Sequence, residues 1–295
     1  MDNARVAAVS YLNTIPLIAG LDRVEGLELI RAVPSRIAAM IEDGSADLGL
    51  ASLIDAARAS VPMALHPVGM IGCEGPTLTV RLFSAVEPEQ ITVLHADTDS
   101  HTSVTLARII LAERYGVRPQ IRDFDTREQM PSGEGIHEPD TGGGPDSGGW
   151  PETVLLIGDK VVVGSPPAVR YPHQIDLGQA WHELTGLPFV YAVWMSLADR
   201  ADEPQIRTAA GLLDRQRRRN LMRLDRLVTD SAETKGWPED LARDYLGRLL
   251  RYEVGPRERE AAALFVSKAA ELGVAPKTEL IWADEVRASE VGAGV

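Results

Sequence analysis

The sequence is poor in cysteine and in basic charge. Its 295 residues hold a single cysteine, Cys73, which excludes an internal disulfide and a cysteine-based metal cage. Lysine and arginine number 30 against 43 aspartates and glutamates, so the net charge is −13. This balance disfavours bulk attraction to nucleic acid or to an anionic membrane. We therefore expect neither as a partner, and an anionic ligand would need its own local binding groups.

Long apolar runs and familiar catalytic motifs are also missing. No apolar stretch reaches the roughly 18–20 residues of a membrane span, and no basic segment followed by a long apolar run opens the chain, so we expect a cytoplasmic protein. There is no glycine-rich dinucleotide loop, Walker loop, His-Glu-x-x-His or Gly-x-Ser-x-Gly motif. No pair among the six histidines has a helical metal-ligand spacing, so the sequence predicts no metal site.

Short apolar runs alternate with amphipathic segments of helix length, which is typical of an α/β fold. Strands are predicted at 6–9, 27–33 and 47–51, and each is followed by residues that can cap a helix. Ser52 occupies this capping place after the third strand. The pattern indicates that the chain leaves this first α/β unit near residue 84 and returns to it near residue 188.

Two crossings between two units predict a pair of α/β lobes with a cleft between them. The first lobe would comprise 1–84 and 188–295, including the C-terminal helices, and the second 85–187. Within the second lobe, 131–150 holds seven glycines and three prolines. Such a composition is typical of a flexible insertion.

Ligands of open α/β sheets bind at the carboxyl ends of strands, which singles out three loops at 10–14, 97–103 and 158–165. In the second loop, the hydroxyls of Ser100, Thr102 and Ser103 precede a helix. Hydroxyls and free backbone N–H groups at a helix start suit a carboxylate or phosphate, although an ordinary N-cap needs only one hydroxyl. Asp159 can serve either as an acid–base group or as a cap.

Several motifs occur in an order that resembles the chorismate dehydratase family of the futalosine route to menaquinone. Together they cover roughly residues 6–194. They are Ser10-Tyr11-Leu12-Asn13-Thr14-x-Pro16-Leu17, Asp47-Leu48-Gly49-Leu50, Gly75-Pro76 before Val80-x-Leu82-Phe83-Ser84, Ser100-x-Thr102-Ser103, Leu155-Leu156-Ile157-Gly158-Asp159, Asp176-Leu177-Gly178-x-x-Trp181 and Thr185-Gly186-Leu187-Pro188-Phe189-Val190-Tyr191-Ala192-x-Trp194.

The resemblance implies the type II periplasmic-binding-protein fold and the dehydration of chorismate to 3-[(1-carboxyvinyl)oxy]benzoate without a metal or organic cofactor. It makes Asn13 a catalytic residue, together with a hydroxyl at Thr79 or Ser84. No protein base is evident, so the side-chain carboxylate of the substrate itself is a hypothetical proton acceptor. The expected substrate-binding residues are Ser10, Tyr11, Ser52, Ser84, Ser100, His101, Thr102, Ser103, Gly158 and Asp159. Chorismate is the expected partner, and no obligate protein partner is evident.

Three positions depart from the family pattern. Thr79 stands where serine is common, His101 where arginine is common, and Arg81 where family members are usually apolar. Either His101 or Arg81 could contact the substrate. Two alternatives remain: a non-catalytic carboxylate-binding protein of the same fold, and the sister enzyme 1,4-dihydroxy-6-naphthoate synthase, whose first loop carries Cys-Pro-Asn-Asp instead of Leu12-Asn13-Thr14.

Overall fold

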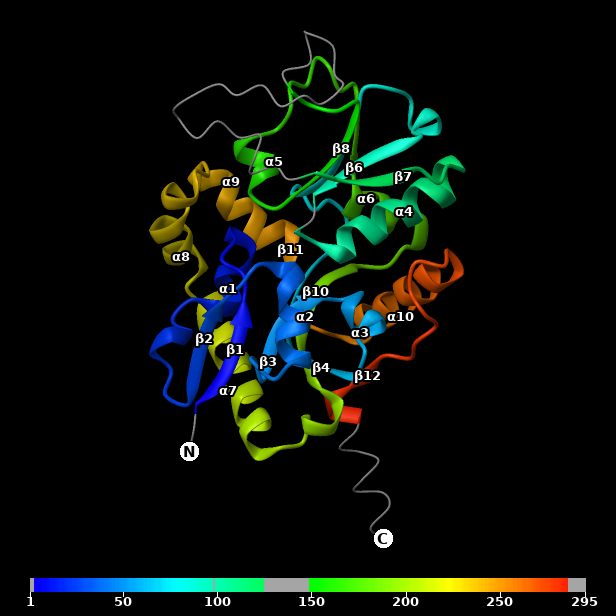
Figure 1. The fold of residues 1–295 in the computed structure, drawn as a ribbon. Helices are drawn as coiled ribbons and strands as arrows, with labels where there is room; N and C mark the ends of the chain where they lie inside the picture. Colours follow the sequence, from blue (N-terminus) through cyan, green and yellow to red (C-terminus); the bar gives the residue numbers. More distant parts are fainter. Residues whose placement is uncertain (1–2, 98, 125–148, 286–295) are drawn as a thin grey trace.

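The computed structural model describes residues 3–97, 99–124 and 149–285. The insertion expected at 131–150 therefore lies outside the described residues except for its last two positions. Figure 1 shows two α/β lobes, one above the other, each built around its own sheet. This arrangement confirms the predicted fold class.

The first lobe contains a seven-stranded sheet in the order β11-β4-β10-β3-β1-β2, with β12 paired to β4. β1 pairs in parallel with β2 and β3, whereas β10 runs antiparallel to β3 and β4. The strands are β1 (Ala4–Ala8), β2 (Leu27–Arg31), β3 (Leu48–Ser52), β4 (Met63–Cys73), β10 (Phe189–Leu197), β11 (Leu250–Arg251) and β12 (Ile281–Trp282).

The second lobe contains a five-stranded sheet in the order β7-β6-β8-β5-β9. Its strands are β5 (Val80–Ser84), β6 (Val93–Asp97), β7 (Gln120–Phe124), β8 (Thr153–Ile157) and β9 (His173–Asp176). Since β5 pairs with β8 and β9, the first crossing between lobes lies before Val80. The boundary expected after residue 84 is corrected accordingly. The second crossing lies between β9 and β10.

Helices cover both sheets, and capping residues and left-handed glycines define their ends. Ser100 caps α4 by accepting from Ser103 N, and Gly116, at φ 69°, ends it. Asp176 caps α6 by accepting from two backbone N–H groups. The helices are α1 (Ile15–Ile18), α2 (Pro34–Glu42), α3 (Asp55–Arg58), α4 (His101–Tyr115), α5 (Lys160–Val163), α6 (Leu177–Thr185), α7 (Pro204–Leu221), α8 (Leu224–Ser231), α9 (Glu239–Asp244) and α10 (Pro256–Glu271).

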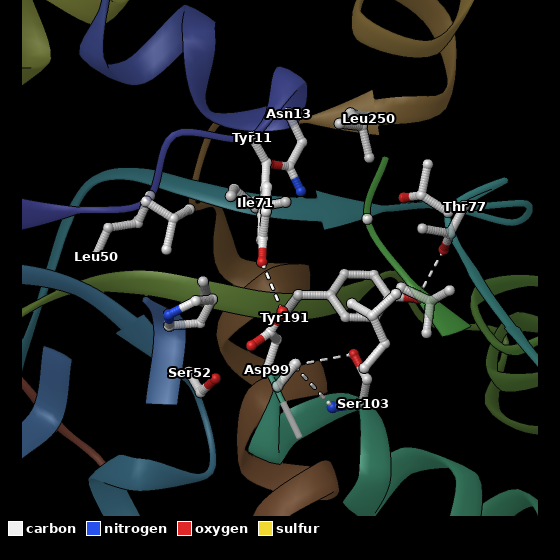
Figure 2. A pocket seen from close by; sticks show the side chains of 18 of the residues that line it. Tyr11, Asn13, Leu50, Ser52, Ile71, Thr77, Asp99, Ser103, Tyr191 and Leu250 are labelled. Atoms are coloured by element: carbon white, nitrogen blue, oxygen red, sulfur yellow. Dashed lines mark hydrogen bonds between the residues drawn. The ribbon is translucent and has the colours of Figure 1, made fainter. Parts of the chain in front are cut away.

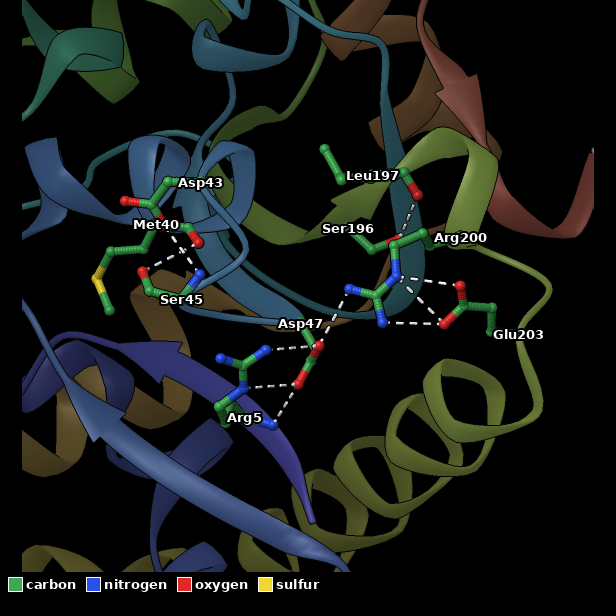
Figure 3. A network of polar contacts seen from close by, with 9 residues as sticks. All are labelled: Arg5, Met40, Asp43, Ser45, Asp47, Ser196, Leu197, Arg200 and Glu203. Atoms are coloured by element: carbon green, nitrogen blue, oxygen red, sulfur yellow. Dashed lines mark hydrogen bonds and ion pairs between the residues drawn. The ribbon is translucent and has the colours of Figure 1, made fainter. Parts of the chain in front are cut away.

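The two ends of β3 have different roles. Just before its first residue, the buried Asp47 carboxylate pairs with Arg5 and Arg200 at 3.2 and 3.1 Å (Figure 3). Burial acts to raise the pKa of Asp47, but the hydrogen bonds from the two arginines outweigh it and hold that pKa below its ordinary value. The carboxyl end of β3 instead faces the space between the lobes. The motif residue Asp47 is therefore an anchor for the strand, remote from the cleft.

Candidate active site between the lobes

A cavity lies between the two lobes, where the loops after β1, β3, β6 and β8 meet. Figure 2 shows side chains entering it from both lobes, among them Tyr11 from above and Ser103 from below. It encloses about 60 Å³, which is room for only a few water molecules. The lobes are therefore closed on each other in this structure.

Seven of the residues predicted for the site line this cavity. They come from all three predicted loops, from the end of β3 and from the link before β5, so these predicted positions gather around one cavity. They are Tyr11, Asn13, Ser52, Thr79, Ser100, Ser103 and Gly158. Ser52 ends β3 in a buried position and does not cap α3, contrary to the capping role expected for it.

Two of the predicted site residues, Ser84 and Ser10, make hydrogen bonds within their own lobes, away from the cavity. Ser84 lies at the far end of β5, where its hydroxyl donates to the carbonyl of Val86 over 2.6 Å. The Ser10 hydroxyl accepts a hydrogen bond from Arg31 at the surface. Neither lines the cavity. Of the two hydroxyls between which the sequence left the choice open, Thr79 is therefore the one that reaches the cleft.

Three other predicted residues join the lobes outside the cavity lining. The Thr102 hydroxyl accepts from the backbone N–H of Ile54 at 3.2 Å, and His101 Nδ1 lies 2.8 Å from Asp55 Oδ1. The hydrogen bond with Asp55 raises the pKa of His101. Asp159 accepts from Leu12 N and Trp237 Nε1. In this structure all three residues make contacts between the lobes.

Arg81 does not line the cavity either. It lies 3.9 Å from Asp176 and donates to Gln174 at 3.3 Å. Neither of the two candidates for a cationic substrate contact, His101 or Arg81, is therefore placed to provide it.

Asn13 and Thr79 approach the cavity from opposite lobes. Asn13 lies in the short turn Leu12–Thr14 after β1, a turn fixed by the Thr14 hydroxyl, which donates to Val9 O or Tyr11 O. Its Oδ1 is buried and has no hydrogen-bond partner among the described residues. Thr79 immediately precedes β5, and its hydroxyl lies 2.6 Å from Tyr245 Oη. An unpaired buried acceptor is costly unless a ligand satisfies it.

The amino end of α4 supplies the hydroxyls of Ser100 and Ser103, whose Oγ atoms lie 3.1 Å apart. Both line the cavity, and the helix behind them runs for 15 residues. Free N–H groups and the helix dipole favour an anion at this end. Ser100 and Ser103 therefore lie at the cavity where the sequence predicts a carboxylate-binding loop, whereas Thr102 does not line it.

A carboxylate pair and one ammonium lie beside this helix end. Lys160 Nζ contacts Asp97 Oδ2 and Asp99 Oδ2 at 2.7 Å each, and Tyr11 Oη donates to Asp99 Oδ2 at 2.9 Å. Burial raises the pKa of Asp97, and Lys160 opposes that shift. Asp99 is the one charged side chain among the described residues that line the cavity. Lys160 is thus the ammonium that offsets this negative charge.

Sequence reasoning missed several residues of the cavity wall. Thr77 comes from the first crossing and Tyr191 from β10, and their hydroxyl oxygens share a hydrogen bond of 2.6 Å. Tyr245 and Leu250 come from the C-terminal third, which carries no family motif. A signal was available at Tyr191 and Leu50, which belong to quoted motifs, and at Asp99, which lies in a loop already singled out.

Residues 4–271 match the model of a protein family described as menaquinone biosynthesis. The chain belongs to this family. A curated relative, the chorismate dehydratase of Thermus thermophilus, is 28% identical over 263 residues, which cover 84% of this chain and 89% of the relative. Membership in the menaquinone biosynthesis family confirms the resemblance that the ordered motifs indicate.

Solved structures confirm the fold of this menaquinone biosynthesis family member. The alkanesulfonate-binding protein SsuA of Xanthomonas axonopodis pv. citri, bound to MOPS, superposes with a TM-score of 0.63 at 13% identity, covering 95% of this chain and 96% of SsuA. A Candida albicans protein with the generic periplasmic-binding-protein fold gives 0.60 at 10% identity, covering 95% and 92%. These neighbours share the architecture of two α/β lobes.

No three or more histidine, cysteine, aspartate or glutamate side chains in the described ranges are grouped to hold a metal ion. No helix in the same part of the chain is long and apolar enough to cross a membrane.

Proposed function

We propose that this protein is a chorismate dehydratase, which removes water from chorismate to give 3-[(1-carboxyvinyl)oxy]benzoate. The observation that carries the proposal is the convergence of Asn13 and Thr79 on one cavity from opposite lobes. The named relative and the family support the same reaction.

The cavity walls suit a ring that carries carboxylates. Leu50, Ile71 and Tyr191 provide an apolar surface for the ring, and Ser100 and Ser103 at the start of α4 face one carboxylate. No arginine or lysine belongs to the described cavity wall. Binding of the anion therefore depends on hydroxyls, backbone N–H groups and the helix dipole.

The proposed reaction removes the C3 proton and the C4 hydroxyl of the substrate as one molecule of water. Thr79 donates a hydrogen bond to the departing hydroxyl, and the Asn13 side chain binds the reacting region through its unpaired oxygen. The substrate's own side-chain carboxylate takes up the C3 proton and passes it to the C4 hydroxyl, which leaves as water, and the electron pair of the broken C–H bond completes the aromatic ring. Because aromatisation supplies the driving force, the residues need to orient the groups rather than provide a strong base.

Lobe closure has a role in this reaction. The closed cavity holds only about 60 Å³, so the substrate enters an opened form and the lobes close over it. Contacts such as Tyr11–Asp99 and Thr102–Ile54 span the closed interface. Closure excludes bulk water and fixes the leaving hydroxyl beside Thr79.

The test is conversion of chorismate by the purified protein alone, followed by ultraviolet absorbance and mass spectrometry. We expect a product that is lighter than chorismate by the mass of one water molecule. Asn13→Ala should lower turnover at least about tenfold, whereas Ser10→Ala, three residues away and outside the cavity, should not. Tight binding of unchanged chorismate would instead support a solute-binding protein.

A further inference from the structure

Tyr245 comes from the C-terminal third of the chain but reaches the cavity between the lobes. It opens a π-helical turn, Tyr245–Leu249, directly after α9, and such turns occur often at functional sites. The side chain is 1% exposed. Its ring stacks on Trp237 with centroids 5.0 Å apart and planes 16° from parallel. The ring is therefore held in one orientation.

The Tyr245 hydroxyl lies between the two residues proposed to act on the substrate. Its Oη is 2.6 Å from Thr79 Oγ1, and the nearby Asn13 side chain acts to lower the pKa of Tyr245. Burial is the larger effect and raises that pKa well above its ordinary value. The phenol therefore keeps its proton and remains a hydrogen-bond donor.

The direction of the Thr79–Tyr245 hydrogen bond follows from the available acceptors. A buried hydroxyl needs an acceptor for its hydrogen. Among the described residues, Thr79 Oγ1 is the acceptor within hydrogen-bond distance of Tyr245 Oη, since Asn13 Oδ1 has no partner. Tyr245 therefore donates to Thr79. The threonine's own hydrogen is then left free to point into the cavity.

We propose that Tyr245 is a positioning residue, which turns the hydroxyl hydrogen of Thr79 toward the leaving hydroxyl of the substrate. The inference rests on the proposed dehydration. If Thr79 donated to Tyr245 instead, it would present only lone pairs to the cavity, and the phenol hydrogen would be buried without an acceptor. Hydrogen bonds in a chain also strengthen each other, so donation from Tyr245 makes the Thr79 hydrogen a better donor.

Tyr245→Phe tests this role because it removes the oxygen and keeps the stacked ring. We expect kcat to fall about tenfold and KM to change by less than about twofold, since the lost effect belongs to the transition state. The matched control is Tyr252→Phe. Tyr252 is 4% exposed and its hydroxyl has no hydrogen-bond partner among the described residues, so its removal should leave kcat unchanged.

A double-mutant cycle separates this role from a packing role. In a Thr79→Val background, adding Tyr245→Phe should lower kcat no further, because the hydroxyl through which Tyr245 acts is gone. Thermal unfolding gives a second readout that does not depend on activity. Thr79→Val alone leaves the buried hydroxyl hydrogen of Tyr245 without an acceptor and should lower the melting midpoint. Adding Tyr245→Phe removes that hydroxyl and should raise the midpoint again.

The outcomes distinguish the inference from the proposed function. Active wild type with a slow Tyr245→Phe variant and a non-additive cycle supports the inference. Active wild type with a fully active Tyr245→Phe variant overturns the inference and leaves the dehydratase proposal standing, as do additive losses of kcat in the cycle. Wild type that leaves chorismate unchanged overturns the proposed function, and this inference with it.

Discussion

Tyr11 Oη donates a hydrogen bond to Asp99 Oδ2 over 2.9 Å, across the cavity from the loop after β1 to the loop after β6 (Figure 2). The phenol is thus part of the closed interface between the lobes. Burial and the nearby carboxylate raise the pKa of Tyr11 far above its ordinary value, so the phenol keeps its proton and remains the donor. The contact stabilises the closed arrangement.

Removing that hydroxyl should weaken closure. For Tyr11→Phe we expect a loss of about 1 kcal/mol, which corresponds to a melting midpoint about 2–4 °C lower in a chain of this size. Tyr115→Phe is the matched control, because no hydrogen bond of the Tyr115 hydroxyl is found among the described residues. Equal midpoints for the two variants in differential scanning fluorimetry would show that the Tyr11–Asp99 contact does not stabilise the protein.

Lys160 offsets the negative charge of Asp97 and Asp99 beside the proposed carboxylate site. Lys160→Met would leave both carboxylates without this ammonium, which costs about 3 kcal/mol for a buried pair. It should also raise the pKa of Asp97 further, since burial already raises it and Lys160 opposes that shift. A carboxyl group whose pKa is raised in the folded state contributes to the free energy of unfolding at pH values below its ordinary pKa. This contribution is lost as the pH rises through the raised pKa.

The expected result for Lys160→Met is therefore a free energy of unfolding that falls as pH rises above about 4, more steeply than in wild type. For a dianionic substrate, KM should rise over the same range. Lys160→Arg keeps the charge and should behave nearly as wild type does. Urea unfolding and initial rates between pH 5 and 8 measure both effects, and parallel pH profiles for the Met and Arg variants would contradict the charge-balance argument.

The loops of the cavity could be predicted because they depend on local signals. A buried strand followed by a capping residue places a loop at the carboxyl end of a sheet, and Asn13 and Ser100 are found there. Which of the hydroxyls of Ser100, Thr102 and Ser103 face the cavity could be decided only from the geometry of the helix start. Ser100 and Ser103 are three residues apart and share a face, whereas Thr102 is turned toward Ile54.

The remaining features depend on contacts distant in sequence. β5 follows β4 after a short link, and nothing local reveals that it pairs with β8 and β9 instead of β4. Ser84 was a candidate beside Thr79, but five residues along an extended strand separate the two by about 16 Å. Tyr245 is 166 positions from Thr79, and no motif connects them. These relationships became visible only when the lobes were assembled.

Cys73 ends β4 at the first crossing and is fully buried. Burial raises the pKa of its thiol to about 12, although hydrogen bonds with Thr77 and Tyr191 oppose the shift. At pH 8 roughly one thiol in ten thousand is then ionised, and the thiolate is the reactive form. We expect no reaction with an aromatic disulfide reagent until the protein unfolds. Ser267→Cys, on the exposed face of α10, supplies a fast-reacting reference, and equally fast labelling of Cys73 would refute its burial.

Gly49 lies in the middle of β3, against α2. A Cβ at this position would lie 2.4 Å from Ile37 Cγ2 and 3.0 Å from Ile41 Cδ1, and both isoleucines are fully buried and cannot move aside. Gly49→Ala should therefore destabilise the fold by about 1–3 kcal/mol. The substitution should also displace the cavity wall, because Leu50 and Ser52 follow Gly49 on the same strand and line the cavity.

Gly211 offers the opposite case within the same chain. It lies in the interior of α7, and a Cβ there would meet nothing within 4 Å. Gly211→Ala should stabilise the protein by about 0.5–1 kcal/mol, since alanine loses less backbone entropy in a helix. Urea unfolding of both variants measures the two effects on one scale. If Gly49→Ala were as stable as Gly211→Ala, the close packing of α2 on β3 would be wrong, and with it the position of Leu50 and Ser52 at the cavity.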